Sequence, residues 1–539
     1  MRVKSRAMAI AGISAVALLA TACGGDSGSS SDSAGKTGGE IIARGCQPQN
    51  PLIGGNTGES CGHDIVELFT STLYRYDAET GKPVKDLAES FEADEANQNF
   101  TVKIKPGVKF QDGTPVTAKS FVDAWNYTAY GPNAQYLSYF MEPIEGFKDV
   151  QGEKPKEKEM SGLKVVDDTT FTIKTAEPTS NLEIRLGYTA FAPQPEAFFK
   201  DPEAFAKKPI GAGPYKVEDY QEGKQAVLTK YNDYGGQAAA GNVDKITFRF
   251  YQDQDAAYAD LQGGNIDVID QVPASAMIDK KFESDLPDRW AQEPYPAIQT
   301  ITFAPEKTSP EYKDPKIRQA ISMAIDRQKI VDDHFDGARE LATSWGAPGI
   351  EGFNEGACGK YCEYNAAEAK KLLDEAGGFK GKMTIGYNAD GDHKAWVTAT
   401  CDSIRTALGV DCTATPVTDF ATFRKNIGEQ KQKGMFRSGW IADYPHIENF
   451  LTPLYSTGGS SNDGKYSNPD FDKALTDAAK LTGEESLAKY KEAEEMLAKD
   501  MPSIPLWYYT ATVGWSEKVA NAKISVASGR VDLLSISVK

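Results

Sequence analysis

Residues 437–446, R-S-G-W-I-A-D-Y-P-H, place a carboxylate in a stretch that begins like a buried strand. Asp443 follows Ile441 by two positions and has bulky aromatic residues on both sides. A buried carboxylate paired with a basic side chain is structural, whereas an unpaired one is costly until a cation neutralises it. Asp443 is therefore a candidate group for binding a cationic ligand. Two structural alternatives stay open, in which Asp443 caps a helix or pairs with Arg437.

Few other residues form a pattern that predicts catalysis or metal binding. The four histidines lie outside any H-E-x-x-H pattern, and A-G-G-F-K-G-K at 376–382 is an incomplete phosphate-binding loop. G-A-G-P-Y at 211–215 lacks the third glycine of a dinucleotide fingerprint. With 77 acidic residues, a pair of glycosidase carboxylates stays open, because close pairs are inevitable. We expect a protein that is not an enzyme and has no cofactor or metal, with a hydrolase as the alternative.

The first 22 residues have the features of a secretory signal peptide. Arg2, Lys4 and Arg6 precede an apolar run that is too short for a comfortable membrane span. The A-T-A-C sequence ending at Cys23 resembles the lipobox of bacterial lipoproteins, although Ala20 stands where leucine is commonest. This resemblance implies that Cys23 is diacylated and becomes the mature N-terminus. An ordinary signal peptide with an incidental cysteine is the alternative.

The remaining chain divides into a short polar segment and a long acidic body. Residues 23–39 are rich in glycine and serine, so we expect a flexible tether. Residues 40–539 are enough for two or three domains with substantial cores. The net charge is −18, and it becomes −21 without the three basic residues of the signal peptide. An acidic body has no electrostatic footprint for nucleic acid and leaves membrane attachment to the lipid.

Six cysteines of the body fall into three pairs that are close in sequence: Cys46 and Cys61, Cys358 and Cys362, and Cys401 and Cys412. Six cysteines allow fifteen connectivities, and export together with sequence proximity favours disulfides within these pairs. A zinc site is the alternative for C-G-K-Y-C at 358–362. No matching second cysteine pair or nearby histidine accompanies that motif.

Strand and helix patterns alternate through the body. T-V-K-I-K at 101–105 alternates apolar and charged residues, as a half-buried strand does. Thr117 can cap a helix, and D-P at 314–315 and N-P at 468–469 are good helix starts. Residues 484–500 predict a helix with one apolar face. This mixture predicts an α/β or α+β body.

Five stretches, in order, carry a family resemblance. They are L-A-E-S-F and its continuation to Trp125 (87–125), P-I-G-A-G-P-Y-K-V-E-D-Y (209–220), A-D-L-Q-G-G-N-I-D-V-I (259–269), K-I-R-Q-A-I-S-M-A-I-D-R-Q-K-I-V (316–331), and the segment from Arg437 with its extension E-N-F-L-T-P-L-Y. Together they resemble the solute-binding proteins of bacterial ABC importers, in the family that takes up oligopeptides, dipeptides and nickel. The match is to the peptide-binding branch, in lipoprotein form.

The resemblance implies a two-lobed α/β fold of the type II periplasmic-binding-protein kind that closes on ligand between its lobes. It also implies an extra domain, typical of large peptide-binding members. The expected units are a signal peptide (1–22), a tether (23–39), a large lobe (40–72, 177–298 and 506–539), its extra domain (73–176) and a second lobe (299–505).

The implied function is capture of peptides and delivery to an ABC import permease. The protein would be a monomer held by its lipid at the extracytoplasmic face of the cell membrane. Another solute on the same scaffold is the first alternative: an oligosaccharide, a siderophore or a nickel complex. A surface sensor that uses the same binding step is a further alternative.

The resemblance also assigns roles to residues of the candidate site. In peptide-binding relatives the aspartate that matches Asp443 takes the α-ammonium of the ligand. Gly439 and Ile441 would lie on the strand that pairs with an extended peptide, and Trp440 would form the wall of a side-chain pocket. Arg437 matches a basic position that can meet the ligand's carboxylate, with Lys431 and Lys433 as looser candidates. Thr57 and Glu59 fall in a loop that supplies backbone contacts in relatives, although the sequence departs from the family there.

Overall fold

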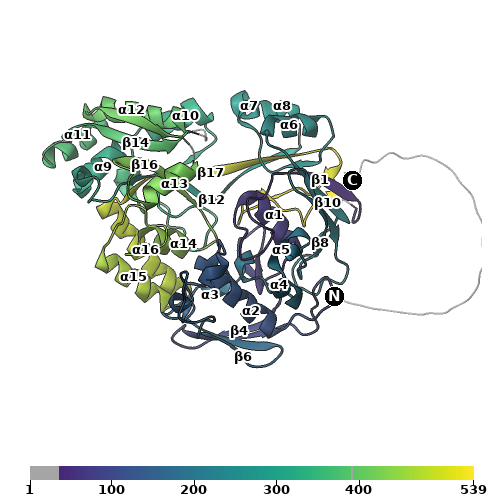
Figure 1. Cartoon of the computed structure of the whole chain (residues 1–539). Coiled ribbons are helices and arrows are strands. Elements are labelled where there is room, and N and C mark those ends of the chain that lie inside the picture. The colour runs from purple at the N-terminus through teal and green to yellow at the C-terminus, as the bar shows by residue number, and fades with distance from the viewer. Residues whose placement is uncertain (1–35, 390–392, 419) are drawn as a thin grey trace, which may run out of the picture.

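Two lobes joined by two long strands make up the protein (Figure 1). The computed structural model describes residues 36–389, 393–418 and 420–539. The expected signal peptide, Cys23 and most of the expected tether lie outside the described residues. The joining strands are β12 (Trp290–Phe303) and β17 (Ser503–Trp515). Their antiparallel ladder is interrupted between Pro294 and Ile298, and proline lacks the amide hydrogen that a ladder needs.

One eleven-stranded sheet runs through both lobes, in the order β15-β14-β16-β12-β17-β11-β1-β10-β9-β8, with β13 paired to β17. The remaining strands of this sheet are β1 (Glu40–Gly45), β8 (Tyr215–Gln221), β9 (Gln225–Lys230), β10 (Lys245–Phe250), β11 (Val268–Ile269), β13 (Glu340–Leu341), β14 (Met383–Asn388), β15 (Cys412–Val417) and β16 (Met435–Ile441). Parallel and antiparallel pairs both occur in it. Because β12 and β17 are shared, any change in their bend moves one lobe relative to the other.

The large lobe contains β1, β8–β11 and the chain that follows β17. Its helices are α1 (Ser60–Phe69), α4 (Glu196–Lys200), α5 (Pro202–Lys207), α6 (Gln254–Gln262), α7 (Ala274–Met277) and α8 (Lys281–Asp285). Short strand pairs complete it: β2 (Tyr74–Tyr76) with β3 (Pro83–Lys85), β18 (Val519–Ala520) with β21 (Ser537–Val538), and β19 (Ile524–Ser525) with β20 (Arg530–Val531). The buried side chains of α1 pack on the apolar residues of the sheet.

An extra domain extends the large lobe toward the second lobe. It has an antiparallel sheet of β4 (Ala88–Ala93), β5 (Asn99–Ile104), β7 (Thr170–Lys174) and β6 (Leu163–Val165), with α2 (Ala118–Ala129) and α3 (Leu182–Arg185). Thr117 caps α2 as predicted, and Phe121 and Trp125 of that helix pack on Phe171 of β7. The core of the domain includes Leu182 and other residues up to 212, so this packing unit continues past residue 176.

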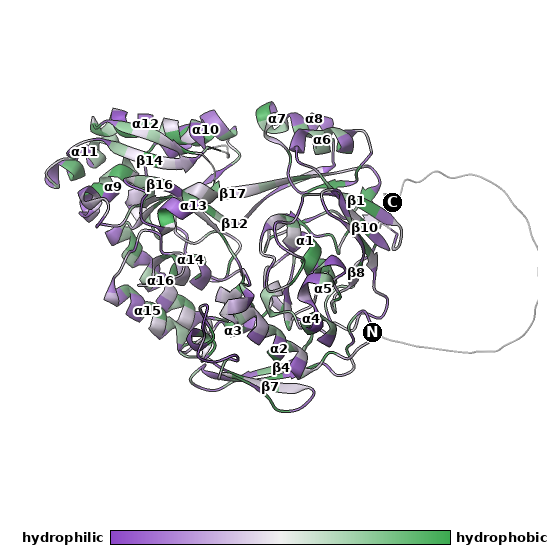
Figure 2. Cartoon of the chain, in the orientation of Figure 1, coloured by the Kyte–Doolittle hydropathy of each residue, from purple (hydrophilic) through white to green (hydrophobic). Residues whose placement is uncertain are grey.

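The second lobe contains β14–β16 and a large helical layer (Figure 1). Its helices are α9 (Pro315–Met323), α10 (Arg327–Phe335), α11 (Ala366–Glu375), α12 (Lys394–Leu408), α13 (Phe420–Gly428), α14 (Glu448–Tyr455), α15 (Pro469–Ala479) and α16 (Gly483–Asp500). Asp314 and Asn468 cap α9 and α15, which confirms both predicted helix starts. Figure 2 shows hydrophilic and hydrophobic residues alternating along the helices, as expected where one helix face covers a core.

Three disulfides join the cysteines in neighbouring pairs: Cys46–Cys61, Cys358–Cys362 and Cys401–Cys412. The first ties the end of β1 to α1, and the third ties α12 to β15. Both sulfurs of the C-G-K-Y-C segment are therefore used, which removes the zinc alternative. Within the described ranges, no three potential ligand side chains gather in a way that suits a metal ion. In the same ranges, none of the helices has the length and apolar character that a membrane crossing requires.

Two of the stretches that carry the family resemblance, residues 87–125 and 209–220, meet at the C-terminal end of α1. The side-chain amide of Gln111 donates to the carbonyls of Phe69 and Tyr215, at 3.0 and 2.6 Å. Gly213 lies so close to α1 that a Cβ there would be 2.5 Å from the carbonyl oxygen of Thr70. The glycines of G-A-G-P-Y are thus needed for close backbone packing that fixes α1, and not for binding a dinucleotide.

Replacement of Gly213 by alanine is expected to lower the free energy of unfolding by about 1–3 kcal/mol, because the added methyl group overlaps backbone atoms that cannot move aside. Urea unfolding followed by tryptophan fluorescence measures the change. Gly428→Ala is the matched control, since no atom lies within 4 Å of its Cβ position. Equal stability of the two variants would contradict this account.

Candidate functional site

Asp443 lies just after β16, at the boundary between the second lobe and the extra domain. Its side chain is partly accessible. Asn449, in the first turn of α14, donates from Nδ2 to Oδ2 of Asp443 at 3.2 Å. The Asn449 Oδ1 atom accepts from the backbone N–H of Asp443 at 2.9 Å. Asn449 therefore fixes both the backbone and the carboxylate of Asp443.

The opposite lobe also contacts this carboxylate. The hydroxyl of Tyr139, in the extra domain, donates to Oδ1 of Asp443 across 3.5 Å. Within the described part of the chain, no basic side chain forms an ion pair with Asp443. Both structural alternatives for Asp443 are therefore wrong: it caps none of the described helices, and Arg437 does not neutralise it.

The surroundings of Asp443 disfavour its charge. Desolvation raises the pKa of Asp443 to about 6, and the hydrogen bonds from Asn449 and Tyr139 offset only part of this increase. The negative charge of Glu448 adds to the increase, whereas Arg185 opposes it. A bound cation would remove this penalty, because an opposite charge within a few ångströms favours the ionised form of a carboxyl group.

Two cavities between the lobes meet at Asp443. One has a volume of about 180 Å³, and second-lobe residues Ile441, Ala442 and Asp443 line it opposite Glu67 and Tyr188 of the large lobe. The other has a volume of about 700 Å³ and extends from Asp443 between the extra domain and α14–α15. Asp443 is thus the residue that an extended ligand lying across both cavities would pass.

A second carboxylate at the same boundary is fully satisfied by the protein. Glu448 accepts from Asn181 Nδ2 and pairs with Arg185 of the extra domain, both at 2.8 Å. The hydroxyl of Tyr444 also donates to it. Burial opposes the charge of Glu448, but Arg185 and Tyr444 outweigh that effect, and the pKa of Glu448 is below its usual value. This pair fastens the second lobe to the extra domain beside the ligand cavities.

Trp440 and Asp443 share one partner. The indole Nε1 of Trp440 donates to the same Asn449 Oδ1 atom at 2.9 Å. Trp440 is half-buried against the core of the second lobe and also lines the 700 Å³ cavity. The predicted pocket wall and the predicted anchor are therefore held together through one amide side chain.

Gly439 and Ile441 lie on the part of β16 that, within the described residues, pairs with a neighbouring strand on one side only. β16 pairs with β12 along residues 435–441, but β14 reaches only Met435 and Phe436 within the described residues. Gly439 permits the close approach of β12, since a Cβ there would be 2.8 Å from the carbonyl oxygen of Ile298. Ile441 is 57% exposed. An extended chain can add to a strand edge of this kind through backbone hydrogen bonds.

Arg437 is directed toward another part of the second lobe. Its Nε donates to Oδ1 of Asn388 at 2.8 Å, and its guanidinium stacks on Phe420 and Phe423. These contacts hold the cation on the same strand as Gly439, six residues before Asp443. The role of Arg437 toward a ligand carboxylate stays a prediction.

Thr57 and Glu59 use their side chains within the large lobe. Thr57 is fully buried and donates to the carbonyl of Pro51 at 2.6 Å. Glu59 caps α1 by accepting from the backbone N–H of Gly62 at 3.0 Å. Their neighbours Gly58 and Ser60, rather than they themselves, line the cavity that contains Asp443. Any ligand contact of this loop would have to come from those neighbours or from its backbone.

Sequence comparison identifies the family of the chain. The profile of bacterial extracellular solute-binding proteins, family 5 Middle, matches residues 82–462. The chain belongs to this family. Family 5 relatives include the periplasmic oligopeptide-binding protein OppA of Escherichia coli, which is 27% identical over 459 residues covering 80% of each chain. The oligopeptide-binding protein OppA of Bacillus subtilis is 25% identical over 517 residues, 92% of each chain.

Solved structures confirm the two-lobed α/β fold of this family 5 protein. The clavulanic acid biosynthesis oligopeptide binding protein 2 has a TM-score of 0.83 at 17% identity, covering 93% of this chain and 96% of that chain. OppA of Haemophilus influenzae in complex with RPPGFSPFR has a TM-score of 0.74 at 22% identity, covering 94% and 99%. At these identities the likeness establishes the fold.

Several residues of the candidate site were not predicted from sequence. Tyr139 and Arg185 reach it from the extra domain, and Asn449 and Glu448 come from α14. The E-N-F-L-T-P-L-Y extension contains both α14 residues, but a polar pair at a helix start is also typical of ordinary capping. Contacts between residues that are far apart in sequence carry no local signal.

Asp443→Asn is expected to raise the free energy of unfolding of the ligand-free protein at pH 8 by about 1–2 kcal/mol and to change it little at pH 4. The folded-state pKa of Asp443, about 6, is above its ordinary value of 3.8. The folded protein therefore binds more protons between these values, and its stability falls as the pH rises through 6. Asparagine cannot ionise and escapes this loss.

Urea unfolding at both pH values, after ligand has been removed by unfolding and refolding, measures the difference. Asp411→Asn is the control, because that carboxylate is exposed at the surface and pairs weakly with Lys382 at 3.5 Å. The same stability change for Asp443→Asn at pH 4 and pH 8 would show that desolvation of a charge is not the cause.

Proposed function

We propose that this protein captures peptides between its lobes and presents them to the permease of an ABC importer. The observation that carries the proposal is the desolvated carboxylate of Asp443, which lacks a cationic partner among the described residues. A peptide's α-ammonium supplies that cation. The unpaired edge of β16 supports the same ligand class, because it offers backbone hydrogen bonds to an extended chain.

The names of family 5 relatives support peptides over the other solutes. Two OppA relatives are named oligopeptide-binding, and a dipeptide-binding protein of Bacillus subtilis is 24% identical over 462 residues. An oligosaccharide needs no charged anchor such as Asp443. For a metal complex, the described ranges contain no cluster of side chains that could coordinate the metal. Delivery requires that the permease bind the closed, ligand-bound form of the protein. Ligand contacts from both lobes, such as those around Asp443 and Tyr139, favour that form.

A hydrolase is a weaker candidate, although G-E-S-C-G at 58–62 matches the nucleophile motif G-x-S-x-G. In hydrolases the serine of this motif sits on a sharp turn between a strand and a helix. Here Ser60 begins α1 after a loop, and Cys61 is in a disulfide. Nδ1 of His63 forms a hydrogen bond with the hydroxyl of Thr189 at 3.4 Å. No hydrogen bond joins His63 to Ser60 in the described structure. The motif residues build the start of α1.

Asp443→Asn is expected to weaken binding of peptides with a free N-terminus by about tenfold or more, because a charge-assisted bond to a desolvated cation contributes about 1.5–3 kcal/mol. Titration calorimetry at pH 7.5 with a peptide and its N-acetylated twin measures the effect. The wild type should prefer the free amine, and the variant should bind both forms alike. Asp411→Asn is again the control and should behave as the wild type.

Equal affinity of the wild type for the two peptide forms would rule out the anchor role of Asp443. Mass spectrometry of the peptide after the titration provides the check on a hydrolase, and the ligand should be recovered intact. Peptide uptake by cells that lack the protein tests the delivery step. The wild-type gene should restore uptake, and the Asp443→Asn gene should not.

We also propose that Cys23 carries lipid that holds the protein at the extracytoplasmic face of the membrane. The support is the A-T-A-C sequence after the apolar run, together with the acidic charge, which offers no attraction of its own to anionic lipid. Cys23→Ser is expected to move the protein from the membrane fraction to the soluble extracytoplasmic fraction. Fractionation with an antibody checks this, and membrane association of both forms would contradict it.

A further inference from the structure

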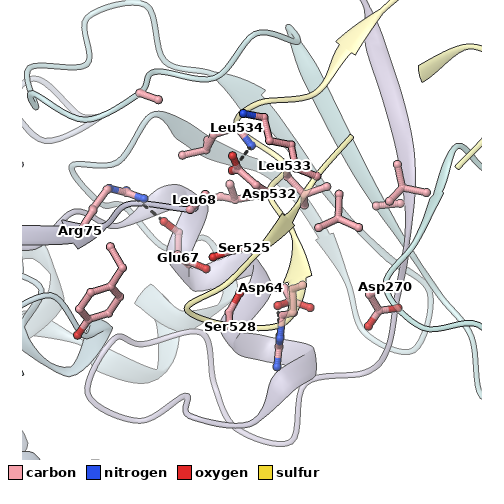
Figure 3. A pocket seen from close by; sticks show the side chains of 18 of the residues that line it. Asp64, Glu67, Leu68, Arg75, Asp270, Ser525, Ser528, Asp532, Leu533 and Leu534 are labelled. Atoms are coloured by element: carbon pink, nitrogen blue, oxygen red, sulfur yellow. Dashed lines mark hydrogen bonds and ion pairs between the residues drawn. The ribbon is translucent and has the colours of Figure 1, made fainter. Parts of the chain in front are cut away.

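A second cavity in the large lobe adjoins the pocket that contains Asp443. Its volume is about 280 Å³, and its walls come from α1, the β2–β3 hairpin, the end of β1 and the C-terminal segment around β19 and β20 (Figure 3). The two cavities share six lining residues: Glu67, Arg75, Tyr76, Ser525, Ser528 and Arg530. With the 180 Å³ pocket, the space falls within the range of about 300–1,000 Å³ that is usual for small-ligand sites. We call the 280 Å³ cavity the α1 cavity.

The positive charges that line the α1 cavity are all neutralised by the protein. Each basic residue has a carboxylate partner: Arg44 with Asp270 at 3.0 Å, Arg75 with Asp86 at 3.0 Å, Lys523 with Glu79 at 2.6 Å, and Arg530 with Asp64. Asp86 is fully buried behind the wall, so Arg75 offers little net charge to the cavity. These four pairs leave the basic groups with little attraction for an anionic ligand.

Three carboxylates that line the α1 cavity, Glu67, Asp77 and Asp532, lack such a partner within the described chain. Within the described chain, neither the side chain of Glu67 of α1 nor that of Asp532 of the C-terminal segment forms an ion pair. Arg75 donates to the backbone carbonyl of Glu67 at 3.2 Å, which leaves the Glu67 carboxylate available. Figure 3 shows Glu67 and Asp532 on separate elements that border the same space. Asp532 accepts only from nearby groups of its own segment, including the backbone N–H of Leu534 at 3.1 Å. A third lining carboxylate, Asp77, accepts from Thr80 within the hairpin turn.

Burial and a neighbouring negative charge both disfavour the ionised form of Asp532. Desolvation raises the pKa of Asp532 above its usual value, and the negative charge of Glu67 raises it further. Hydrogen bonds from Ser535 and Leu534 and the charge of Lys523 offset only part of this increase. Glu67 is exposed to the cavity and also lines the pocket of Asp443 from the opposite lobe. A ligand whose ammonium group is at Asp443 can therefore direct a second cation past Glu67 into the α1 cavity.

We propose that the α1 cavity binds the side chain of a basic first residue of the peptide, with Glu67 and Asp532 as its counter-charges. The preferred ligands are then peptides that begin with lysine, arginine or ornithine. This inference rests on the proposed function, because it takes the α-ammonium of the ligand to be at Asp443. It adds a selectivity for the first side chain, which backbone pairing along β16 cannot provide.

The test compares four peptides that differ only at the first residue or its amine: Lys-Ala-Ala-Ala, norleucine-Ala-Ala-Ala, Glu-Ala-Ala-Ala and N-acetyl-Lys-Ala-Ala-Ala. Norleucine keeps the alkyl chain of lysine without its charge. The wild type is expected to bind the lysine peptide about tenfold more tightly than the norleucine peptide by titration calorimetry. The glutamate peptide should bind most weakly of the three free amines.

Glu67→Gln is expected to reduce the preference for lysine over norleucine to about threefold or less, while the affinity for the norleucine peptide changes little. Asp532→Asn should act in the same direction. Glu89→Gln is the matched control, because it removes one negative charge at the surface of the extra domain, where Glu89 pairs with Lys103. That control should keep the full preference.

The possible results separate the inference from the proposed function. Equal affinity for the lysine and norleucine peptides, or a preference that both Glu67→Gln and Asp532→Asn leave unchanged, overturns the α1 cavity as a basic subsite. If the acetylated peptide still binds far more weakly in that case, the proposed function stands. If none of the peptides binds, both fail.

Discussion

The site depends on one carboxylate that loses water without gaining a cation. Asn449 and Tyr139 donate hydrogen bonds to Asp443, yet its pKa still rises to about 6. Above pH 6 the protein thus carries an electrostatic penalty that a positively charged group can remove. Because Tyr139 belongs to the extra domain and Asp443 to the second lobe, a cation bound here stabilises the approach of the two lobes. Ligand binding and closure are coupled when the contacts exist only in the closed form.

Glu448, five residues further along the chain, is a carboxylate whose charge the protein itself neutralises. It is more deeply buried than Asp443, but Arg185, Asn181 and Tyr444 satisfy it completely. Breaking such a buried pair by removing one partner is strongly unfavourable. Glu448 therefore holds the second lobe against the extra domain without regard to ligand, and it fixes the start of α14. Since Asn449 is the next residue of that helix, Glu448 also positions the side chain that binds Asp443.

Features set by residues close together in sequence could be predicted, and those set by contacts between distant residues could not. Thr117, Asp314 and Asn468 were predicted as helix caps because capping acts within three residues. The two-lobed fold came from five family-like stretches, since local patterns do not determine which strands are shared. Asp443 was recognisable because a carboxylate at an apolar strand end is unusual. Tyr139 was not, because its contact spans 304 residues and is set only by tertiary packing.

The same distinction explains how recognition is divided among three parts of the site. The edge of β16 offers backbone hydrogen bonds, which any extended peptide can form, so it contributes affinity with little selectivity. In the proposed function, Asp443 binds a cation at one point and would so fix the register of the peptide on that edge. Once the register is fixed, the first side chain must enter a defined space, and the charge of that space can select it. Glu67 borders both cavities, so the selectivity proposed for the α1 cavity depends on Asp443 placing the end of the ligand.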